Sequence, residues 1–149
     1  MVYLFLDMDG VLHPVSSSLA LRWSGGHRVA ELLKRNPSVQ IVVTSNYRWH
    51  LDLDDLRALF PAAIRDRVVG ATPVVLLGDG QNKLPGRHRE VLAWLSANAT
   101  EAVRWLAVDD DPGHYAAQCE ELYLTDGQTG LTDEDLDVLT RRLQLLAPG

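Results

Sequence analysis

Short runs of apolar residues, many of them β-branched or aromatic, recur along the chain at the length expected of buried strands. Four of these runs lie at 2–6, 39–43, 103–108 and 122–124. A fifth region has two interpretations. Gly70 and Pro73 separate the apolar residues 68–69 from 74–77, which leaves either one interrupted strand or two short ones.

Between these runs, apolar residues recur three and four positions apart, as they do on one face of a helix. Such stretches lie around 29–33, at about 48–60, at 87–97 and after Thr132. Thr132 with Asp135 three residues later is typical of a helix start. The alternation of strands with helices predicts a doubly wound, mostly parallel, Rossmann-like α/β sheet with helices on both faces. We expect a single domain over 1–149.

Composition narrows the range of partners. The formal net charge of −6 argues against a general polyanion binder, because non-specific affinity for nucleic acid comes mainly from Lys and Arg. Cys119 is the only cysteine, so we expect no disulfide partner. The chain shows neither a basic leader nor the roughly 20 apolar residues that span a bilayer. We therefore expect a cytoplasmic protein without a membrane partner, and the sequence leaves its oligomeric state open.

Two acids, Asp7 and Asp9, directly follow the first predicted strand. Alternation along a strand would point both carboxylates to the same side, where like charges need a cation or a shared proton. The alternative is a simple turn, because Asp9-Gly10 is a common turn dipeptide.

Polar residues also end two later strands. These residues are Thr44 and Ser45 after the second strand, and Asp109 and Asp110 after the fourth. The carboxyl ends of parallel strands share one edge of the sheet, so all these residues are predicted to meet the first acid pair in one crevice.

These positions resemble the four motifs of the haloacid dehalogenase (HAD) superfamily of phosphoryl-transfer enzymes. In the family's order, the matching segments are Asp7-x-Asp9-x-Val11, Val43-Thr44-Ser45, Lys83 and Asp109-Asp110. A closer likeness is to the small HAD domains associated with bacterial RNA-repair proteins. It is carried by residues 5–14, 89–95, 108–111 and 129–132.

The resemblance implies a Mg²⁺-dependent phosphatase that acts through an aspartyl-phosphate. Asp7 would attack the phosphoryl group, and Asp9 would protonate the leaving oxygen and then activate water. Thr44 and Lys83 would stabilise the transferring phosphoryl group. Substrate contacts would come from Ser45, Arg48 and Arg87, the last as a substitute for Lys83. The metal ligands would be Asp7, Asp9 through its backbone carbonyl, Asp109 and Asp110.

The spacing between the motifs limits the size of any cap domain, and this bears on the size of the substrate. About thirty residues separate Asp9 from Val39, and they already contain a helix, so no large cap domain fits there. An uncapped crevice would admit a bulky phosphorylated substrate, such as a nucleic-acid end or a phosphoprotein. Two alternatives stay open: a phosphoacceptor signalling module, and a HAD-fold binding domain without activity.

Aromatic residues and histidines add little on their own. The five histidines show no metal-ligand spacing, although His13 is placed to line the mouth of the crevice. Tryptophans stack on nucleobases where they are exposed. Trp94 and Trp105 are expected in the core, whereas the positions of Trp23 and Trp49 stay open.

Overall fold

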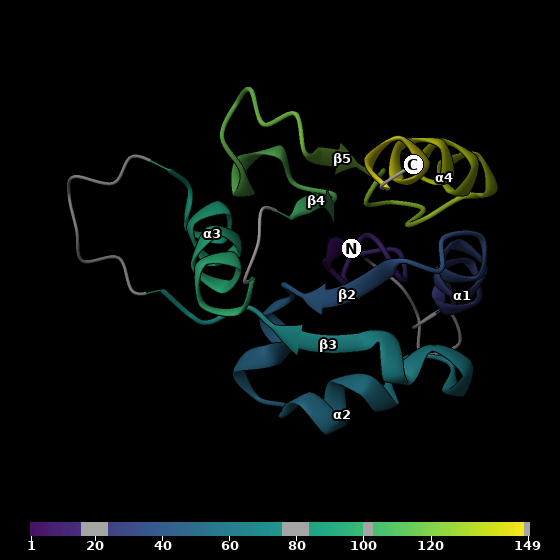
Figure 1. Cartoon of the computed structure of the whole chain (residues 1–149), viewed down its shortest axis with the longest axis horizontal. Helices are drawn as coiled ribbons and strands as arrows, with labels where there is room; N and C mark the ends of the chain where they lie inside the picture. Colours follow the sequence, from purple (N-terminus) through teal and green to yellow (C-terminus); the bar gives the residue numbers. More distant parts are fainter. Residues whose placement is uncertain (16–23, 76–83, 100–102, 148–149) are drawn as a thin grey trace.

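A parallel sheet forms the centre of the computed structural model, which describes residues 1–15, 24–75, 84–99 and 103–147 (Figure 1). Its strands are β1 (Val2–Leu6), β2 (Val39–Val43), β3 (Val68–Ala71), β4 (Arg104–Asp109) and β5 (Leu122–Leu124). They lie in the order β3-β2-β1-β4-β5, and all neighbouring pairs are parallel. The predicted α/β class and the Rossmann-like sheet are confirmed.

Helices cover both faces of the sheet, as predicted (Figure 1). Helices α1 (Gly26–Arg35) and α4 (Asp133–Leu146) pack against one another on one face, and the short α2 (Leu53–Ala58) contributes to the same core. Helix α3 (Gly86–Asn98) covers the opposite face. No cap domain is present among the described residues, and none of the helices described there is long and apolar enough to cross a bilayer.

Strand β1 is buried on both sides, which explains why its residues are all apolar. Leu4 and Leu6 pack in the core that α1 and α4 cover. Tyr3 and Phe5 face α3, where the ring of Trp94 lies 4.9 Å and 5.7 Å from theirs in edge-to-face contacts. Because side chains alternate along a strand, the next residue on the α3 side is Asp7.

The predicted helix over about 48–60 is wrong in its extent. The segment instead forms a 3₁₀ turn, η2 (Asn46–Trp49), and then α2. The Ser45 hydroxyl accepts a hydrogen bond from the Tyr47 N–H and starts the first turn, whereas the Asp52 carboxylate accepts from the Asp55 N–H and starts a separate helix. Two N-caps, Ser45 and Asp52, thus divide the segment that the apolar periodicity joined.

The ambiguous region forms one strand where it is described. β3 ends at Ala71, residues 72–75 belong to no strand, and 76–77 lie outside the described residues. The helix start predicted at Thr132 is confirmed, because Thr132 and Asp135 form a reciprocal capping box at the first turn of α4.

Candidate active site

An arginine and two carboxylates meet at the carboxyl edge of the sheet. Asp7 directly follows β1, Asp109 ends β4, and Arg87 lies in the first turn of α3. Arg87 Nη1 lies 3.3 Å from Asp7 Oδ2 and 3.0 Å from Asp109 Oδ2, while Nη2 donates to Asn46 Oδ1 at 3.1 Å. All three charged side chains are buried. The strand register brings the acids together, because Leu6 pairs with Val108 one residue earlier on each strand.

His114 joins this cluster from the turn η4 (Pro112–His114), whose N-cap is Asp111. Its Nδ1 atom lies 3.0 Å from Asp109 Oδ2 and 3.1 Å from Arg87 Nη1. Arg87 can only donate and a carboxylate can only accept, so Nδ1 serves one of these partners at a time. The Asp109 hydrogen bond raises the pKa of His114, which favours the protonated ring donating to Asp109.

The surroundings shift the pKa values of the two acids in opposite directions. Burial, followed by the charge of Asp109, raises the pKa of Asp7 from 3.8 to about 7, even though Arg87 acts in the opposite direction. Burial also acts to raise the pKa of Asp109, but hydrogen bonds from His114 and the Asp111 N–H, together with Arg87, lower it. Asp7 therefore holds a proton more readily than Asp109 does.

Asp9 lies apart from the buried pair, with 56% of its side chain exposed. Its Oδ1 atom lies 2.6 Å from Nε2 of the buried His13 and accepts a hydrogen bond from the Tyr47 hydroxyl at 3.4 Å. Two elements therefore fix the direction of this carboxyl group: the loop that follows β1 and the turn η2. A solvent-facing, oriented carboxyl group suits proton exchange with a substrate better than the buried Asp7 does.

Asp110 packs between two glycines. A Cβ atom on Gly10 would lie 2.4 Å from the Asp110 carboxyl group, and one on Gly127 would lie 2.7 Å from Asp110 Oδ2. Burial and then the charge of Asp109 raise the pKa of Asp110. Its carboxylate thus needs two residues without side chains in order to reach this position.

The loop after β5 holds the loop that carries the acid pair. Thr125 Oγ1 donates to the Gly10 carbonyl at 2.7 Å, and the Leu131 N–H donates to the Val11 carbonyl at 2.7 Å. The Val15 N–H donates to the carbonyl of Gly127 at 2.8 Å. These bonds join segments more than 100 residues apart in sequence.

We predict that Gly10→Ala lowers the free energy of unfolding by about 2 kcal/mol or more, because Gly10 has a φ of +75° and its Cβ would strike Asp110. Gly86→Ala is the matched control: only Arg89 Nη2, at 4.0 Å, approaches that position at the start of α3, so this variant should keep or raise stability. Chemical denaturation of the metal-free variants measures both. Equal stabilities would contradict the contact with Asp110.

Thr44 and Ser45 form the wall beside Asp7. The Thr44 N–H donates to the Leu6 carbonyl, which places Thr44 next to Asp7. The Thr44 hydroxyl is fully buried and has no hydrogen-bond partner among the described residues. Ser45 uses its hydroxyl to cap η2, so its side chain shapes the loop.

Arg48 holds the segment of Thr44 and Ser45 in place through hydrogen bonds to its backbone. Its guanidinium donates to the carbonyls of Thr44, Ser45 and Thr72 and forms a buried ion pair with Glu90 at 2.5 Å. All three nitrogens of this guanidinium thus donate to protein atoms, in four hydrogen bonds. The substrate contact predicted for Arg48 remains a prediction, and the observed role is to hold the ends of β2 and β3 beside α3.

A divalent cation fits the donor atoms of this cluster. Asp7, Asp109 and His114 each offer one ligand atom, and these atoms lie within 4.8 Å of one another. Burial and then the charge of Asp109 raise the pKa of Asp7, and a bound cation would favour its charged form. Carboxylate oxygens are the ligands that Mg²⁺ prefers.

A family model described as the HAD domain in Swiss Army Knife RNA repair proteins matches residues 3–136. The chain belongs to this family. The match includes all five strands except Val2, the first residue of β1, and every residue of the cluster described above. No match was found among curated proteins or among solved structures.

In this HAD domain the structure brings together some of the predicted site residues and separates others. Asp7, Asp109 and Arg87 are in direct contact, and Thr44 lies beside them. Asp9 lies at the rim, and Asp110 is not among the three grouped ligand atoms, although its charge acts on Asp7. Lys83 lies outside the described residues, so its predicted role stays a prediction.

Some contributors to the HAD site were not predicted. His114 contacts Asp109, and Glu90 holds Arg48. Asn46 accepts from Arg87, and Tyr47 donates to Asp9. The sequence offers a signal for the first, since His114 follows the acidic strand end within a short Asp-Pro-Gly turn. It offers none for Glu90, which reaches Arg48 only through the packing of α3 against the sheet.

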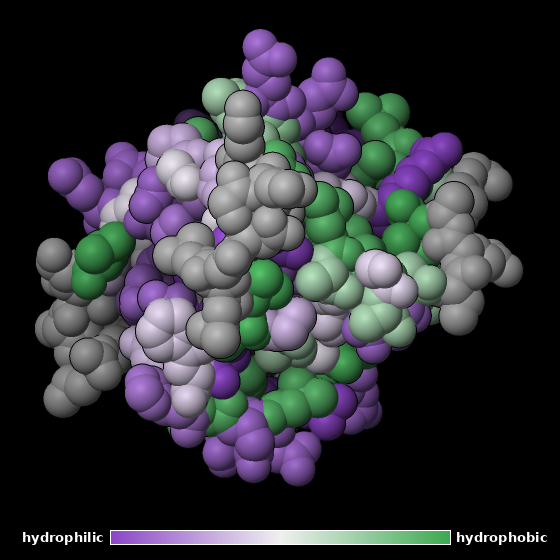
Figure 2. Space-filling view, turned by 90° about the vertical axis from the view of Figure 1, so that its left-hand side faces the viewer, coloured by the Kyte–Doolittle hydropathy of each residue, from purple (hydrophilic) through white to green (hydrophobic). Residues whose placement is uncertain are grey.

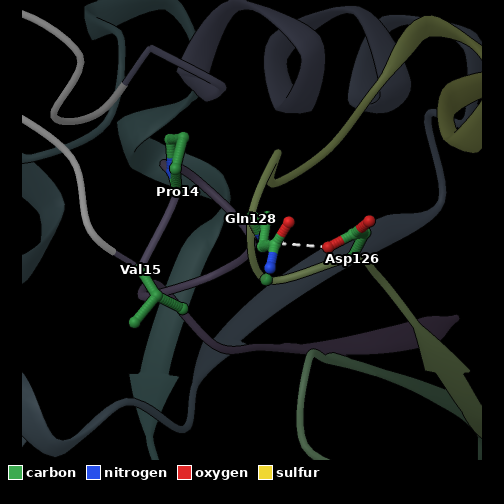
Figure 3. A pocket seen from close by; sticks show the side chains of 5 residues that line it. Pro14, Val15, Asp126 and Gln128 are labelled. Atoms are coloured by element: carbon green, nitrogen blue, oxygen red, sulfur yellow. Dashed lines mark hydrogen bonds between the residues drawn. The ribbon is translucent and has the colours of Figure 1, made fainter.

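The surface near the site is mixed in character. Figure 2 shows the side toward which β2 and β3 point in Figure 1: hydrophilic residues gather at its top and left, and hydrophobic residues to the right of centre. A cavity of about 550 Å³ adjoins the joined loops and is lined by Pro14, Val15, Asp126, Gly127 and Gln128 (Figure 3). The Asp126 carboxylate accepts from the Gln128 N–H and shapes this turn.

Proposed function

We propose that this HAD domain is a Mg²⁺-dependent phosphatase that removes a phosphoryl group through an aspartyl-phosphate on Asp7. The observation that carries the proposal is the contact of buried Asp7 with Arg87 beside Asp109, at the strand ends where the family has its site. Membership of the family supports phosphatase-like chemistry. The nucleophile, the metal and the substrate are our inference.

In the first step, an Asp7 oxygen would attack phosphorus while the bond from phosphorus to the ester oxygen breaks. The leaving oxygen would take a proton from Asp9, whose exposed carboxyl group His13 and Tyr47 orient. In the second step, water would attack the phosphoenzyme, give its proton to Asp9 and release phosphate from Asp7. One acid would thus serve both steps, and it would return to its starting state.

Asp7, Asp109 and His114 would hold the cation, with Asp9 through its carbonyl and Asp110 as further expected ligands. Bound Mg²⁺ would supply positive charge that offsets repulsion between the carboxylate and the phosphate. Arg87 contacts Oδ2 of Asp7 and Oδ2 of Asp109. We infer that Arg87 balances the charge of these acids and also binds phosphate oxygens of the substrate.

The proposed substrate is the phosphorylated end of a polynucleotide. The family is named for its occurrence in RNA repair proteins, and the described residues include no cap domain over the site. A negative net charge limits general affinity for nucleic acid, so recognition would depend on the terminal nucleotide rather than on a long phosphate track.

The test is hydrolysis of a generic aryl phosphate and of oligonucleotides phosphorylated at the 3′ or the 5′ end. We expect turnover with Mg²⁺ and at least a 100-fold loss after chelation, because the cation contributes several kcal/mol to such reactions. No hydrolysis of any substrate would favour a silent binding domain. A phosphoenzyme that persists for minutes without turnover would favour a phosphoacceptor module.

A further inference from the structure

A small cavity next to Asp9 has no part in the chemistry described so far. It measures about 310 Å³ and is lined by Asp9, Asn46, Tyr47, Trp49 and His50. This volume lies at the lower end of the range for ligand sites, which suits one ring system rather than a long chain. Trp49 is 57% exposed, so its ring is accessible to a ligand.

The turn η2 explains why these side chains face the cavity. A 3₁₀ turn has three residues per turn, so residues three apart lie on the same side. Asn46 lies in line with Trp49, and Tyr47 lies in line with His50. Arg48 is the remaining residue, and its guanidinium is bound to backbone carbonyls and to Glu90. The inward Arg48 thus anchors the turn while its neighbours line the cavity.

The cavity lies on the leaving-group side of the site if the proposed function holds. Asp9 would protonate the leaving oxygen, and Asp9 lines the cavity. Asn46 also connects the two regions, because its Oδ1 accepts from Arg87, which contacts Asp7. A phosphate at Arg87 would therefore place the rest of its nucleotide toward Trp49.

The lining favours an uncharged ring over a second phosphate. It contains aromatic side chains and one carboxylate, with no Lys or Arg among its residues. Nucleobases stack on exposed aromatic rings with little dependence on sequence. We propose that this cavity is the subsite for the base of the terminal nucleotide, with Trp49 as its stacking surface. The inference rests on the proposed function for the identity of the neighbouring site.

The experiment compares oligonucleotides whose phosphorylated terminal residue carries a base with the same oligonucleotides ending in an abasic residue. Binding is measured by fluorescence anisotropy on the Asp7→Asn protein, and kcat/KM is measured on the wild type. We expect the base to improve both by about 10-fold to 100-fold. Trp49→Ala should reduce this ratio to about 1, and Trp49→Phe should retain most of it.

Leu145→Ala is the matched control, because Leu145 is also a large exposed apolar residue (80% exposed) but lies on α4 outside the cavity. It should leave the ratio unchanged. Equal binding of base-bearing and abasic ends would overturn the subsite, whether or not the protein hydrolyses phosphate. Binding of phosphotyrosine peptides that depends on Trp49, without oligonucleotide binding, would also overturn it. Loss of hydrolysis alone would contradict only the proposed function.

Discussion

Asp7→Asn is expected to lower metal-dependent kcat by at least about 10⁴-fold, because an amide cannot form the acyl-phosphate and removing a nucleophile costs this much or more in other enzymes. The measurement is steady-state hydrolysis of an aryl phosphate at saturating Mg²⁺. Turnover within ten-fold of the wild type would rule out Asp7 as the nucleophile. Asp126→Asn is the matched control, since it makes the same change in a loop next to the site.

The same substitution should stabilise the metal-free fold at pH 8. The pKa of Asp7 is about 7 in the folded protein and 3.8 without its surroundings, so the folded state binds the proton more tightly. The stabilisation from that proton is present below pH 3.8 and is lost as the pH rises through about 7. Asp7→Asn should therefore match the wild type near pH 4 and exceed it at pH 8, by up to about 4 kcal/mol. Denaturation curves at the two pH values measure this difference.

Arg87→Ala is the second large effect. It would leave Asp7 and Asp109 buried without their arginine, and removing one partner of such a group costs about 3–5 kcal/mol of stability. Loss of a phosphate-binding donor would also lower kcat/KM by about 100-fold to 1,000-fold. Added Mg²⁺ should restore much of the lost stability but not the lost activity.

Two variants identify the cation that binds phosphate. Arg87→Lys keeps the charge but cannot contact the acids and Asn46 with two separate nitrogens, so an intermediate effect is expected. Lys83→Ala tests the other candidate. If Lys83→Ala abolishes turnover while Arg87→Ala stays within three-fold of the wild type, Lys83 is the phosphate-binding cation and Arg87 is structural.

The sequence predicted the sheet and the position of its acids because both depend on local pattern. The run before Asp7 is apolar at every position, and only a strand buried on both faces needs that. Parallel strand order then brings Asp109 to Asp7 without further information. The helix over 48–60 was predicted less well, since Asp52 starts a new helix where the apolar spacing continues.

The partners of these residues could not be predicted, because they depend on how separate elements pack. Arg87 reaches Asp7 only because α3 packs on the Tyr3 and Phe5 side of β1. From the sequence, Arg48 was predicted to bind substrate. In the fold, its guanidinium is bound by Glu90 and by three backbone carbonyls. Contacts between side chains that are far apart in the sequence leave no periodic pattern in it.

The bonds from Thr125 and Leu131 to the loop after β1 also affect the order of assembly during synthesis. Asp7 and its loop leave the ribosome before the residues that hold this loop, which are made more than 100 positions later. A nascent chain therefore carries the Asp7 carboxylate without these bonds to its loop until Thr125 and Leu131 have been made. Ribosome-bound chains that end before Thr125 should be inactive even with α3 and β4 complete.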